Sequence, residues 1–284
     1  MKLSVCMITY NHENYLLEAI EGILMQKTDF DLELVIANDN SPDNTNLIIE
    51  ELVKNHKEGH KIKYLNNKVN LGMMPNFVNA IKNCTGKYIA LCEGDDYWID
   101  ENKLQKQVDF LDQNDDYSIC YHKVNLNEND LIIEDTITLE GNQTTTIQDL
   151  ANGNYIHTCS VVYRNFLFDK FPEYFYIAPV GDYFLHLLNS QFGKIYCIDE
   201  KMAIYRVHNT SYWSSKSQKT KTEIWINFLD EIKVYFNDEI KNILELQIKK
   251  YTDVDIPIPA QVKIKKTIPY YFRKIKKVFS FKKI

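Results

Sequence analysis

Short apolar runs alternate with amphipathic stretches from residue 3 to residue 114. The runs are nearly continuous in apolar residues, as in strands buried on both faces, and fall at residues 3–10, 32–39, 61–67 and 87–93. The stretches between them repeat apolar residues at helical spacing, at residues 15–26, 44–56, 76–84 and 101–114. This alternation predicts an α/β fold with a mostly parallel sheet covered by helices on both faces.

The C-terminal part of the chain has a different pattern. Residues 222–251 repeat apolar positions at helical spacing, which predicts one or two helices packed on the main body or on another subunit. Two prolines in "DVDIPIPAQ" then interrupt the pattern and precede a basic end.

Composition and cysteine spacing are those of an ordinary soluble protein of 284 residues, with 45% hydrophobic and 25% charged residues. The six cysteines are scattered and form no CxxC pair, so we expect buried thiols in a reducing cytoplasm rather than a zinc site or disulfides. The N-terminal apolar stretch is too short for a signal peptide, and no run is long enough to span a membrane. These features predict a cytoplasmic protein.

Charge is unevenly distributed. Residues 263–284 hold nine Lys or Arg and no acid. Since the whole chain has a net charge of −6, the rest of the chain carries about −15. In this tail the lysines alternate with apolar residues, as in segments that lie on anionic lipid surfaces. A solvated basic end that pairs with the acidic body is an equal alternative, and the acidic body disfavours nucleic acid as a partner.

Polar residues follow each of the four expected strands. They are Tyr10, Asp39, Asn70 and the pair Asp95 and Asp96. Ligands bind beyond the carboxyl ends of strands in sheets of this kind. Any one of these residues could be a turn former or a helix cap, but four strand ends at one edge favour a binding site.

Three acidic residues crowd together in "EGDDYW", where Glu93 is followed by Asp95 and Asp96. Neighbouring carboxylates repel each other, so a buried strand that ends in them favours a bound cation. Their hard oxygen atoms suit Mg²⁺ or Mn²⁺.

Five segments of the chain, in order, strongly resemble the family 2 glycosyltransferases, which have the GT-A fold. They are "SVCMITYNHENYLLEAIEGILMQ", "VIANDNSPDNT", "NLGMMPNFVNAIKNCTGKYIALCEGDDYW", "VGDYFLHLL" and "IYRVHNTS". The resemblance covers about residues 1–215 and departs from the family at Asn38, where an aspartate is usual.

The resemblance implies an inverting, metal-dependent enzyme that moves a sugar from a nucleotide-diphosphate sugar, with UDP favoured, to a hydroxyl group of a glycan or lipid-linked acceptor. It implies a catalytic domain over 1–215, with a nucleotide-binding half (1–100) and an acceptor-binding half (101–215), followed by a helical extension (216–255) and the basic tail (256–284). By analogy, such an enzyme serves bacterial surface-polysaccharide synthesis, such as capsule or lipopolysaccharide, at the inner face of a membrane.

The resemblance also implies roles for individual residues. Tyr10 would stack on the base, Asp39 would accept a hydrogen bond from its edge, and the other nucleotide contacts would come from Thr9, Asn11, Asn70 and Asp95. Asp95 would hold the ribose or a metal-bound water, and the direct metal ligands would be Asp96 and His208.

On the acceptor side, Asp182 matches the family's catalytic base at the start of a helix, where an aspartate is also a favoured cap. Gly181 would leave room for the sugar, Glu93 would belong to its pocket, and Trp213 would lie in a loop that closes over the donor. Tyr97 and Trp98 are large enough either to shape the sugar pocket or to pack beneath the acidic loop. The remaining histidines that we weighed are expected to be structural: His12, His122, His157 and His186.

Two other functional classes fit the same fold. A catalytically silent protein that binds sugar nucleotides or glycans would lack turnover, although Asp95, Asp96 and Asp182 argue against it. A nucleotidyltransferase would need a glycine-rich phosphate loop, and the first strand leads into "YNHEN" instead. The donor sugar, the acceptor and the oligomeric state are not determined by these patterns.

Overall fold

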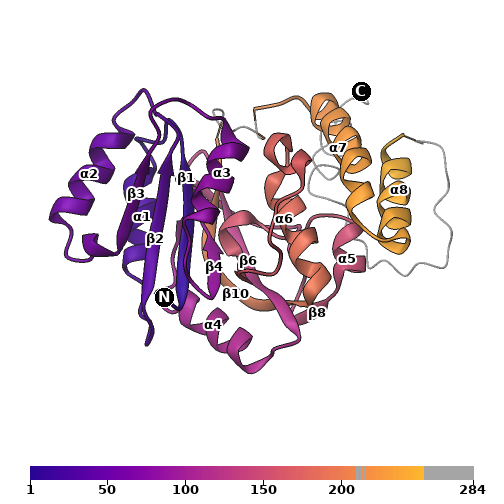
Figure 1. Cartoon of the computed structure of the whole chain (residues 1–284), viewed down its shortest axis with the longest axis horizontal. Coiled ribbons are helices and arrows are strands. Elements are labelled where there is room, and N and C mark those ends of the chain that lie inside the picture. The colour runs from indigo at the N-terminus through magenta and orange to yellow at the C-terminus, as the bar shows by residue number, and fades with distance from the viewer. Residues whose placement is uncertain (209–210, 212, 214, 253–284) are drawn as a thin grey trace, which may run out of the picture.

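The computed structural model describes residues 1–208, 211, 213 and 215–252, and its centre is a ten-stranded sheet (Figure 1). The strand order is β3-β2-β1-β4-β9-β6-β10-β5, with β7 paired to β6 and β8 paired to β10. The strands are β1 (Leu3–Thr9), β2 (Leu32–Asn38), β3 (Ile62–Asn66), β4 (Tyr88–Leu91), β5 (Tyr97–Trp98), β6 (Tyr117–Glu128), β7 (Leu131–Glu134), β8 (Gln143–Thr145), β9 (Val162–Arg164) and β10 (Lys194–Val207).

Helices cover the sheet on both faces. The α-helices are α1 (Leu16–Leu24), α2 (Thr45–Asn55), α3 (Met73–Lys82), α4 (Lys103–Gln113), α5 (Ile147–Ala151), α6 (Gly181–Asn189), α7 (Gln218–Ile232) and α8 (Asp238–Thr252). Five short 3₁₀ turns complete the order: η1 (Gly59–Lys61), η2 (Thr158–Ser160), η3 (Glu173–Ile177), η4 (Ser190–Phe192) and η5 (Lys233–Tyr235). The strands and helices expected from the apolar pattern up to residue 114 are all confirmed, within a few residues at their ends.

The N-terminal half of the sheet is parallel. β1 lies between β2 and β4, and β3 lies outside β2, all four running in the same direction. Their carboxyl ends therefore meet at one edge, as the sequence pattern predicts.

The second half of the sheet joins the first through antiparallel β9, which pairs with both β4 and β6. The long strands β6 and β10 then run parallel, and the short strand β5 pairs antiparallel with β10 between Trp98 and Ala203. This last pairing places the C-terminal end of β10 beside the acidic loop 93–96, although about a hundred residues separate them in sequence.

The core has two layers because successive strand residues point to opposite faces. In β1, Leu3, Val5 and Met7 pack toward α1 and α4, whereas Cys6 packs toward α3 and α6. All six cysteines are buried and free, which confirms the expectation of reduced core thiols.

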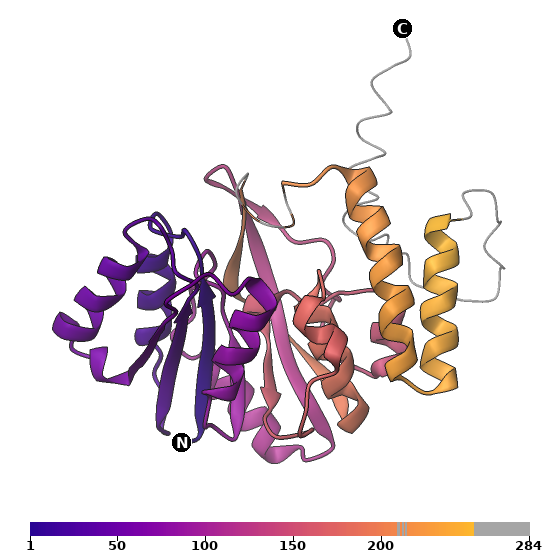
Figure 2. The ribbon, with the colours of Figure 1, turned by 45° about the horizontal axis from the view of Figure 1, so that its top comes forward.

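The predicted C-terminal helices exist and pack on the core, with α7 and α8 side by side beyond α6 (Figure 2). Trp225 of α7 stacks on Tyr183 of α6 with ring centroids 5.2 Å apart, and its Nε1 donates to Gln247 of α8 at 2.9 Å. Gln247 in turn donates to the Ala151 carbonyl at 2.6 Å. The extension is therefore part of the same hydrophobic core.

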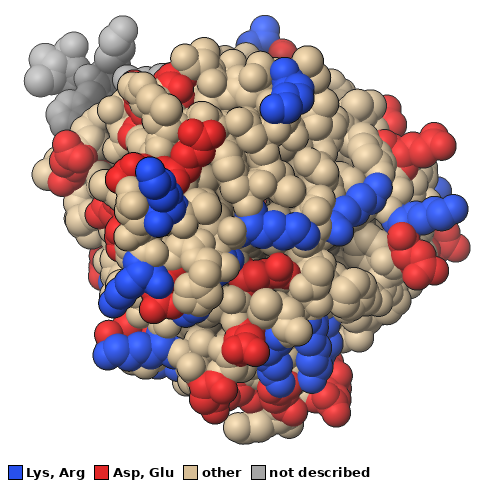
Figure 3. Space-filling view, turned by 60° about the vertical axis from the view of Figure 1, so that its left-hand side comes forward, with Lys and Arg blue, Asp and Glu red and all other residues tan. Residues whose placement is uncertain are grey.

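The surface of the N-terminal half mixes both signs of charge, with no large patch of one sign on the face in Figure 3. Within the described part of the chain, no helix is both long and apolar enough to cross a membrane. Most of the predicted helical extension is described, but its last residues and the whole basic tail (256–284) lie outside the described residues.

Candidate functional site

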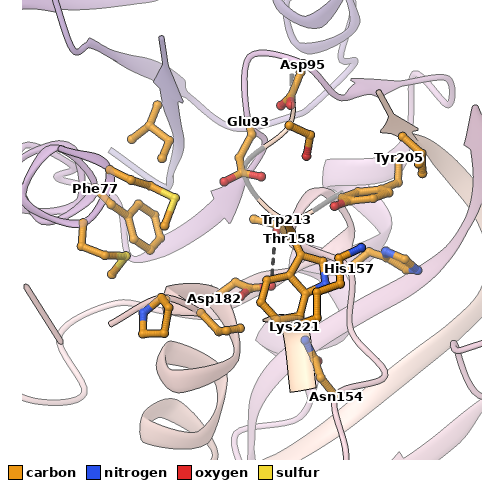
Figure 4. A pocket seen from close by; sticks show the side chains of 18 of the residues that line it. Phe77, Glu93, Asp95, Asn154, His157, Thr158, Asp182, Tyr205, Trp213 and Lys221 are labelled. Atoms are coloured by element: carbon orange, nitrogen blue, oxygen red, sulfur yellow. Dashed lines mark hydrogen bonds between the residues drawn. The ribbon is translucent and has the colours of Figure 1, made fainter. Parts of the chain in front are cut away.

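A cleft of about 650 Å³ lies at the carboxyl edge of the parallel strands, and α6 and α7 form its other wall (Figure 4). Eight of the residues expected at the site line it: Thr9, Tyr10, Asp39, Asn70, Glu93, Asp95, Gly181 and Asp182. Five others do not line it: Asn11, Asp96, Tyr97, Trp98 and His208. The strand-end rule therefore located the cleft, but the roles within it differ from those expected.

Asp95 is the aspartate of the acidic pair that faces the cleft. Its Oδ2 lies 3.0 Å from His208 Nε2 and 3.8 Å from His12 Nε2. Burial would raise the pKa of Asp95, but these two imidazoles outweigh it, so the pKa lies below its usual range. The ring of Tyr15 packs on His208 at 4.7 Å and fixes its orientation. Asp95 and His208 thus form an oriented carboxylate–imidazole pair, and His12, expected to be structural, lies beside it.

Asp96 has a different environment. It is 1% exposed, its Oδ1 accepts the backbone N–H of Arg206 at 2.8 Å, and the thiol of Cys159 lies against its carboxyl group. Burial raises the pKa of Asp96 well above its ordinary value, and the neighbouring charge of Asp95 adds to the effect. One oxygen of Asp96 thus joins the loop to β10, whereas Oδ2 is buried without a hydrogen-bond partner among the described residues, so the expected direct contact with a metal stays a prediction.

Arg206 links several parts of this loop and received no role from the sequence. Its guanidinium donates to the backbone carbonyl of Asp95 at 2.7 Å and pairs with Glu18 of α1. The same group lies 4.3 Å from the ring centroid of Tyr97 and 5.2 Å from that of Tyr15. Because Tyr15 also packs on His208, Arg206 supports both members of the Asp95–His208 pair.

Asp39 holds the loop after β3 in place. Its carboxylate accepts the N–H groups of Leu71 at 2.7 Å and Gly72 at 2.9 Å, and the side-chain amide of Asn67 at 3.0 Å. A carboxylate has about four acceptor positions, so three are occupied before any base binds. Asn70, in the same loop, accepts the Gly72 N–H at 3.0 Å and lies at the exposed rim of the cleft.

The departure from the family at Asn38 has a local explanation. Its amide donates to the Tyr64 hydroxyl at 3.0 Å, and its Oδ1 accepts from the backbone and hydroxyl groups of Ser41 at 3.1 and 2.6 Å. An aspartate could not donate to Tyr64. The Ser41 hydroxyl also accepts the N–H of Asn11, which has a left-handed φ of 61° and does not line the cleft.

The first strand ends in an exposed ring and a buried hydroxyl. Tyr10 is 48% exposed at the cleft, so its face is available for stacking. Thr9 is 2% exposed, and its hydroxyl oxygen makes no hydrogen bond with the described residues.

Glu93 and Asp182 enter the cleft from opposite walls (Figure 4). Burial, together with repulsion from Asp95, Asp96 and Asp182, raises the pKa of Glu93 well above its ordinary value. Asp182 lies in the first turn of α6, and its Oδ2 accepts the Thr158 hydroxyl at 3.1 Å.

Three expectations about the sugar pocket are corrected. A Cβ on Gly181 would meet the sulfur of Met74 at 2.3 Å, so this glycine permits close packing of α6 on α3 rather than leaving room for a sugar. Trp98 is 2% exposed, and its Nε1 donates to the Cys159 carbonyl at 2.8 Å, so it packs beneath the acidic loop. Tyr97 packs on Arg206 instead of lining the pocket.

In the second half of the chain, sequence reasoning placed Gly181 and Asp182 at the site but missed other parts of the cleft wall. His157, expected to be structural, lines it beside Asp135 and Tyr205, and α7 adds a further face whose lining residues are Gln218, Lys221, Thr222 and Trp225. Trp213, expected in a closing loop, also lines the cleft. His122 and His186 are fully buried, in agreement with a structural role.

The donor set fits a divalent cation that takes few protein ligands. Within the described ranges, no three His, Cys, Asp or Glu side chains gather as a complete metal shell. Asp95 nevertheless offers a carboxylate at the cleft, of the kind that suits Mg²⁺ or Mn²⁺, and the imidazole of His208 lies 3.0 Å from it. Mg²⁺ commonly takes one or two protein carboxylates and completes its shell with phosphate oxygens and water.

Comparison with known proteins identifies the family. The model of glycosyl transferase family 2 matches residues 4–175 of this chain. The chain belongs to this family. The C-terminal part of the cleft, including α6 and α7, lies beyond the matched residues.

Relatives and solved structures agree with this assignment. "Uncharacterized protein Rv1520" from Mycobacterium tuberculosis is 35% identical over 215 residues, which are 75% of this chain and 61% of that protein. "Uncharacterized glycosyltransferase alr2836" from Nostoc sp. is 30% identical over 237 residues, covering 78% of this chain and 70% of the relative. The chain thus spans about three fifths of the mycobacterial protein's length.

Two solved glycosyltransferases share the fold of this family 2 member. S. aureus TarS (residues 1–349) in complex with UDP-GlcNAc superimposes with a TM-score of 0.65 at 20% identity, over 89% of this chain and 72% of that one. Mannosyltransferase PcManGT from Pyrobaculum calidifontis, in complex with GDP-Man and Mn²⁺, gives 0.64 at 12% identity, over 100% and 76%. At these identities the likeness shows the GT-A fold.

Proposed function

We propose that this family 2 member is a metal-dependent, inverting glycosyltransferase that uses a nucleotide-diphosphate sugar, with UDP favoured, and a hydroxyl group of a glycan or lipid-linked acceptor. One observation carries the proposal. The carboxylates of Asp95 and Asp182 line a single cleft from opposite sides (Figure 4), as expected where a donor and an acceptor bind next to each other, and His208 lies 3.0 Å from Asp95.

On the donor side, we assign the metal contact to Asp95 and His208 and leave Asp96 to position the loop. When bound there, a divalent cation would neutralise charge on the departing nucleoside diphosphate. Tyr10 offers an exposed ring for the base, and Asp39, which also lines the cleft, keeps one acceptor position for its edge. The complexes of TarS with UDP-GlcNAc and of PcManGT with GDP-Man and Mn²⁺ support nucleotide-sugar binding to this fold.

On the acceptor side, Asp182 takes the proton of the attacking hydroxyl group. The hydroxyl oxygen forms a bond to the anomeric carbon as the bond from that carbon to the diphosphate breaks, and the electron pair leaves with the diphosphate. Attack opposite the leaving group inverts the anomeric centre. Thr158, which donates to Oδ2 of Asp182, leaves Oδ1 available for this proton.

The test is release of nucleoside diphosphate from a panel of UDP, GDP and dTDP sugars, with Mn²⁺ or EDTA. The full chain is compared with Asp95→Asn and Asp182→Asn, and Asp109→Asn on α4, remote from the cleft lining, is the control. Metal-dependent release that both site variants lose supports the proposal. Metal-dependent thermal stabilisation by a nucleotide sugar without turnover, even with added glycan acceptors, would favour a silent binding protein.

A nucleotidyltransferase would instead form nucleotide sugar from a nucleoside triphosphate and a sugar phosphate. No stabilisation by any nucleotide would contradict both the transferase and the binding protein.

A further inference from the structure

We infer that Asp135, His157 and Tyr205 form an acceptor subsite that binds a second hydroxyl group of a saccharide, next to the hydroxyl that Asp182 deprotonates. The inference rests on the proposed function and adds the residues that select a polyhydroxy acceptor. All three residues line the cleft, and Figure 4 shows His157 and Tyr205 on the same side of it.

The imidazole of His157 is held on one side by a carboxylate. Its Nε2 is buried and lies 3.1 Å from Asp135 Oδ1, at an oblique angle. The side chains of the two residues are 10% and 4% exposed. Asp135 is itself anchored, since its two oxygens accept the backbone N–H groups of Ile137 at 3.0 Å and Thr138 at 2.8 Å.

This anchoring keeps Asp135 ionised. Burial would raise its pKa, but contact with His157 and the donors of residues 137 and 138 lower the pKa below its usual range. In the neutral imidazole, a carboxylate beside Nε2 favours the tautomer that carries its proton on this nitrogen, and Nδ1 is then the hydrogen-bond acceptor of the ring.

The backbone places this acceptor next to the proposed base. Residue 158 follows His157 directly, and its hydroxyl donates to Asp182 at 3.1 Å. The His157 carbonyl accepts both the N–H of Ser160 at 3.0 Å and its hydroxyl at 2.7 Å, which fixes the turn. One rigid turn therefore orients both Asp182 and the His157 ring.

Tyr205 gives the subsite an aromatic side. Its ring centroid lies 5.0 Å from that of His157, and it comes from β10 rather than from the turn. A sugar ring offers C–H groups for an aromatic face and hydroxyl groups for a nitrogen acceptor. A monohydroxyl alcohol offers the reacting group alone, so the subsite distinguishes saccharides from simple alcohols.

The test measures how the donor sugar divides between water and added alcohols. The full chain receives the donor that it hydrolyses, with an excess of methyl β-D-glucopyranoside, methyl α-D-mannopyranoside or 2-propanol, and mass spectrometry gives the transferred fraction. Nucleoside diphosphate release gives total turnover. The variants are His157→Ala, His157→Asn and Asp135→Asn, with exposed His60→Ala as the control.

We expect His157→Ala to lower the fraction transferred to methyl glycosides by about 10-fold, the usual effect of losing one hydrogen bond. Donor hydrolysis and transfer to 2-propanol should stay within about 2-fold, because Asp182 is intact. His157→Asn supplies an amide oxygen and should restore part of the transfer, whereas Asp135→Asn should give an intermediate loss.

An unchanged transferred fraction in a folded His157→Ala protein would overturn the subsite, as would equal losses of hydrolysis and transfer. A wild-type protein that hydrolyses donor but transfers to neither methyl glycoside would also overturn it while leaving the proposed function intact. If the wild type releases no diphosphate from any donor, the proposed function fails, and the subsite fails with it.

Discussion

Replacement of Arg206 by methionine should separate support of the acidic loop from general stability. The guanidinium contacts the Asp95 carbonyl, the rings of Tyr15 and Tyr97, and the carboxylate of Glu18. Methionine keeps the volume between the two rings but has no donor. The N–H of residue 206 that holds Asp96 belongs to the backbone and remains.

The size of the effect follows from these contacts. A hydrogen bond from a charged donor contributes about 1.5–3 kcal/mol, and the two ring contacts add about 0.5–1 kcal/mol each. The pair with Glu18 adds little, because the Glu18 side chain is 57% exposed. Since methionine recovers part of the ring packing, we expect a loss of about 2–4 kcal/mol in the free energy of unfolding.

The Arg206→Met variant should bind the metal more weakly even under conditions in which it is fully folded. Without its support, the carboxylate of Asp95 and the ring of His208 are no longer held in one geometry, and loss of such supporting contacts typically lowers metal affinity by about 10–100-fold. The assay is titration of Mn²⁺ into protein with UDP by calorimetry, well below the melting temperature of the variant. Arg206→Lys should be intermediate, since it keeps the charge but not the planar fork.

Arg164→Met is the matched control. Arg164 also donates to backbone carbonyls, those of Leu111, Asn114 and Tyr117, but away from the cleft lining. Because it loses three such bonds instead of one, it should lose at least as much stability and yet keep its affinity for Mn²⁺ with UDP. Equal affinity in Arg206→Met and wild type, or an equal loss in Arg164→Met, would refute the reasoning.

Three further predictions follow from the surroundings of individual side chains. Asp95→Asn should lower the affinity for Mn²⁺ in the presence of UDP, measured by calorimetry, by at least about 10-fold. Asp96→Asn keeps an acceptor for the backbone N–H of Arg206, so its affinity should stay within about 3-fold of the wild type. The reverse order of the two effects would contradict the assignment. Asp39→Asn should lower the free energy of unfolding by about 2–3 kcal/mol in urea, because its new N–H₂ group faces donors, and an unchanged midpoint would refute this. Lys103 is fully buried, and desolvation lowers its pKa to about 7. In the unfolded chain Lys103 keeps its proton up to about pH 10.4, so the free energy of unfolding of the wild type should rise from pH 7 to about pH 10.4. The melting temperature of Lys103→Met, taken relative to the wild type, should therefore fall from pH 7 toward pH 10. A constant difference between the two proteins would count against this assignment.

The sequence determined the elements and the edge where the site lies. Apolar runs of strand length separated by amphipathic helices allow one main arrangement, and parallel strands bring their carboxyl ends together. That physics is local, so Tyr10, Asp39, Asn70 and the acidic loop could be placed at one edge without knowing any distant contact. The choice between Asp95 and Asp96 could not be made in this way, because residues 92–96 lie outside the regular strands and strand alternation no longer fixes where a side chain points.

The tertiary structure decided which groups work together. The pairing of β5 with β10 brings the backbone of Arg206 next to the acidic loop. The N–H of Arg206 then donates to the carboxyl group of Asp96, which does not line the cleft. His157 contacts Asp135, which lies 22 residues earlier in the sequence. Helix α7 lines the cleft because it packs on α6. These contacts join segments far apart in sequence, and their energy depends on geometry that no single segment specifies. Local sequence patterns therefore determine the fold and the edge of the sheet at which the site lies. The pairing of Asp95 with His208 and of Asp135 with His157 depends on tertiary packing.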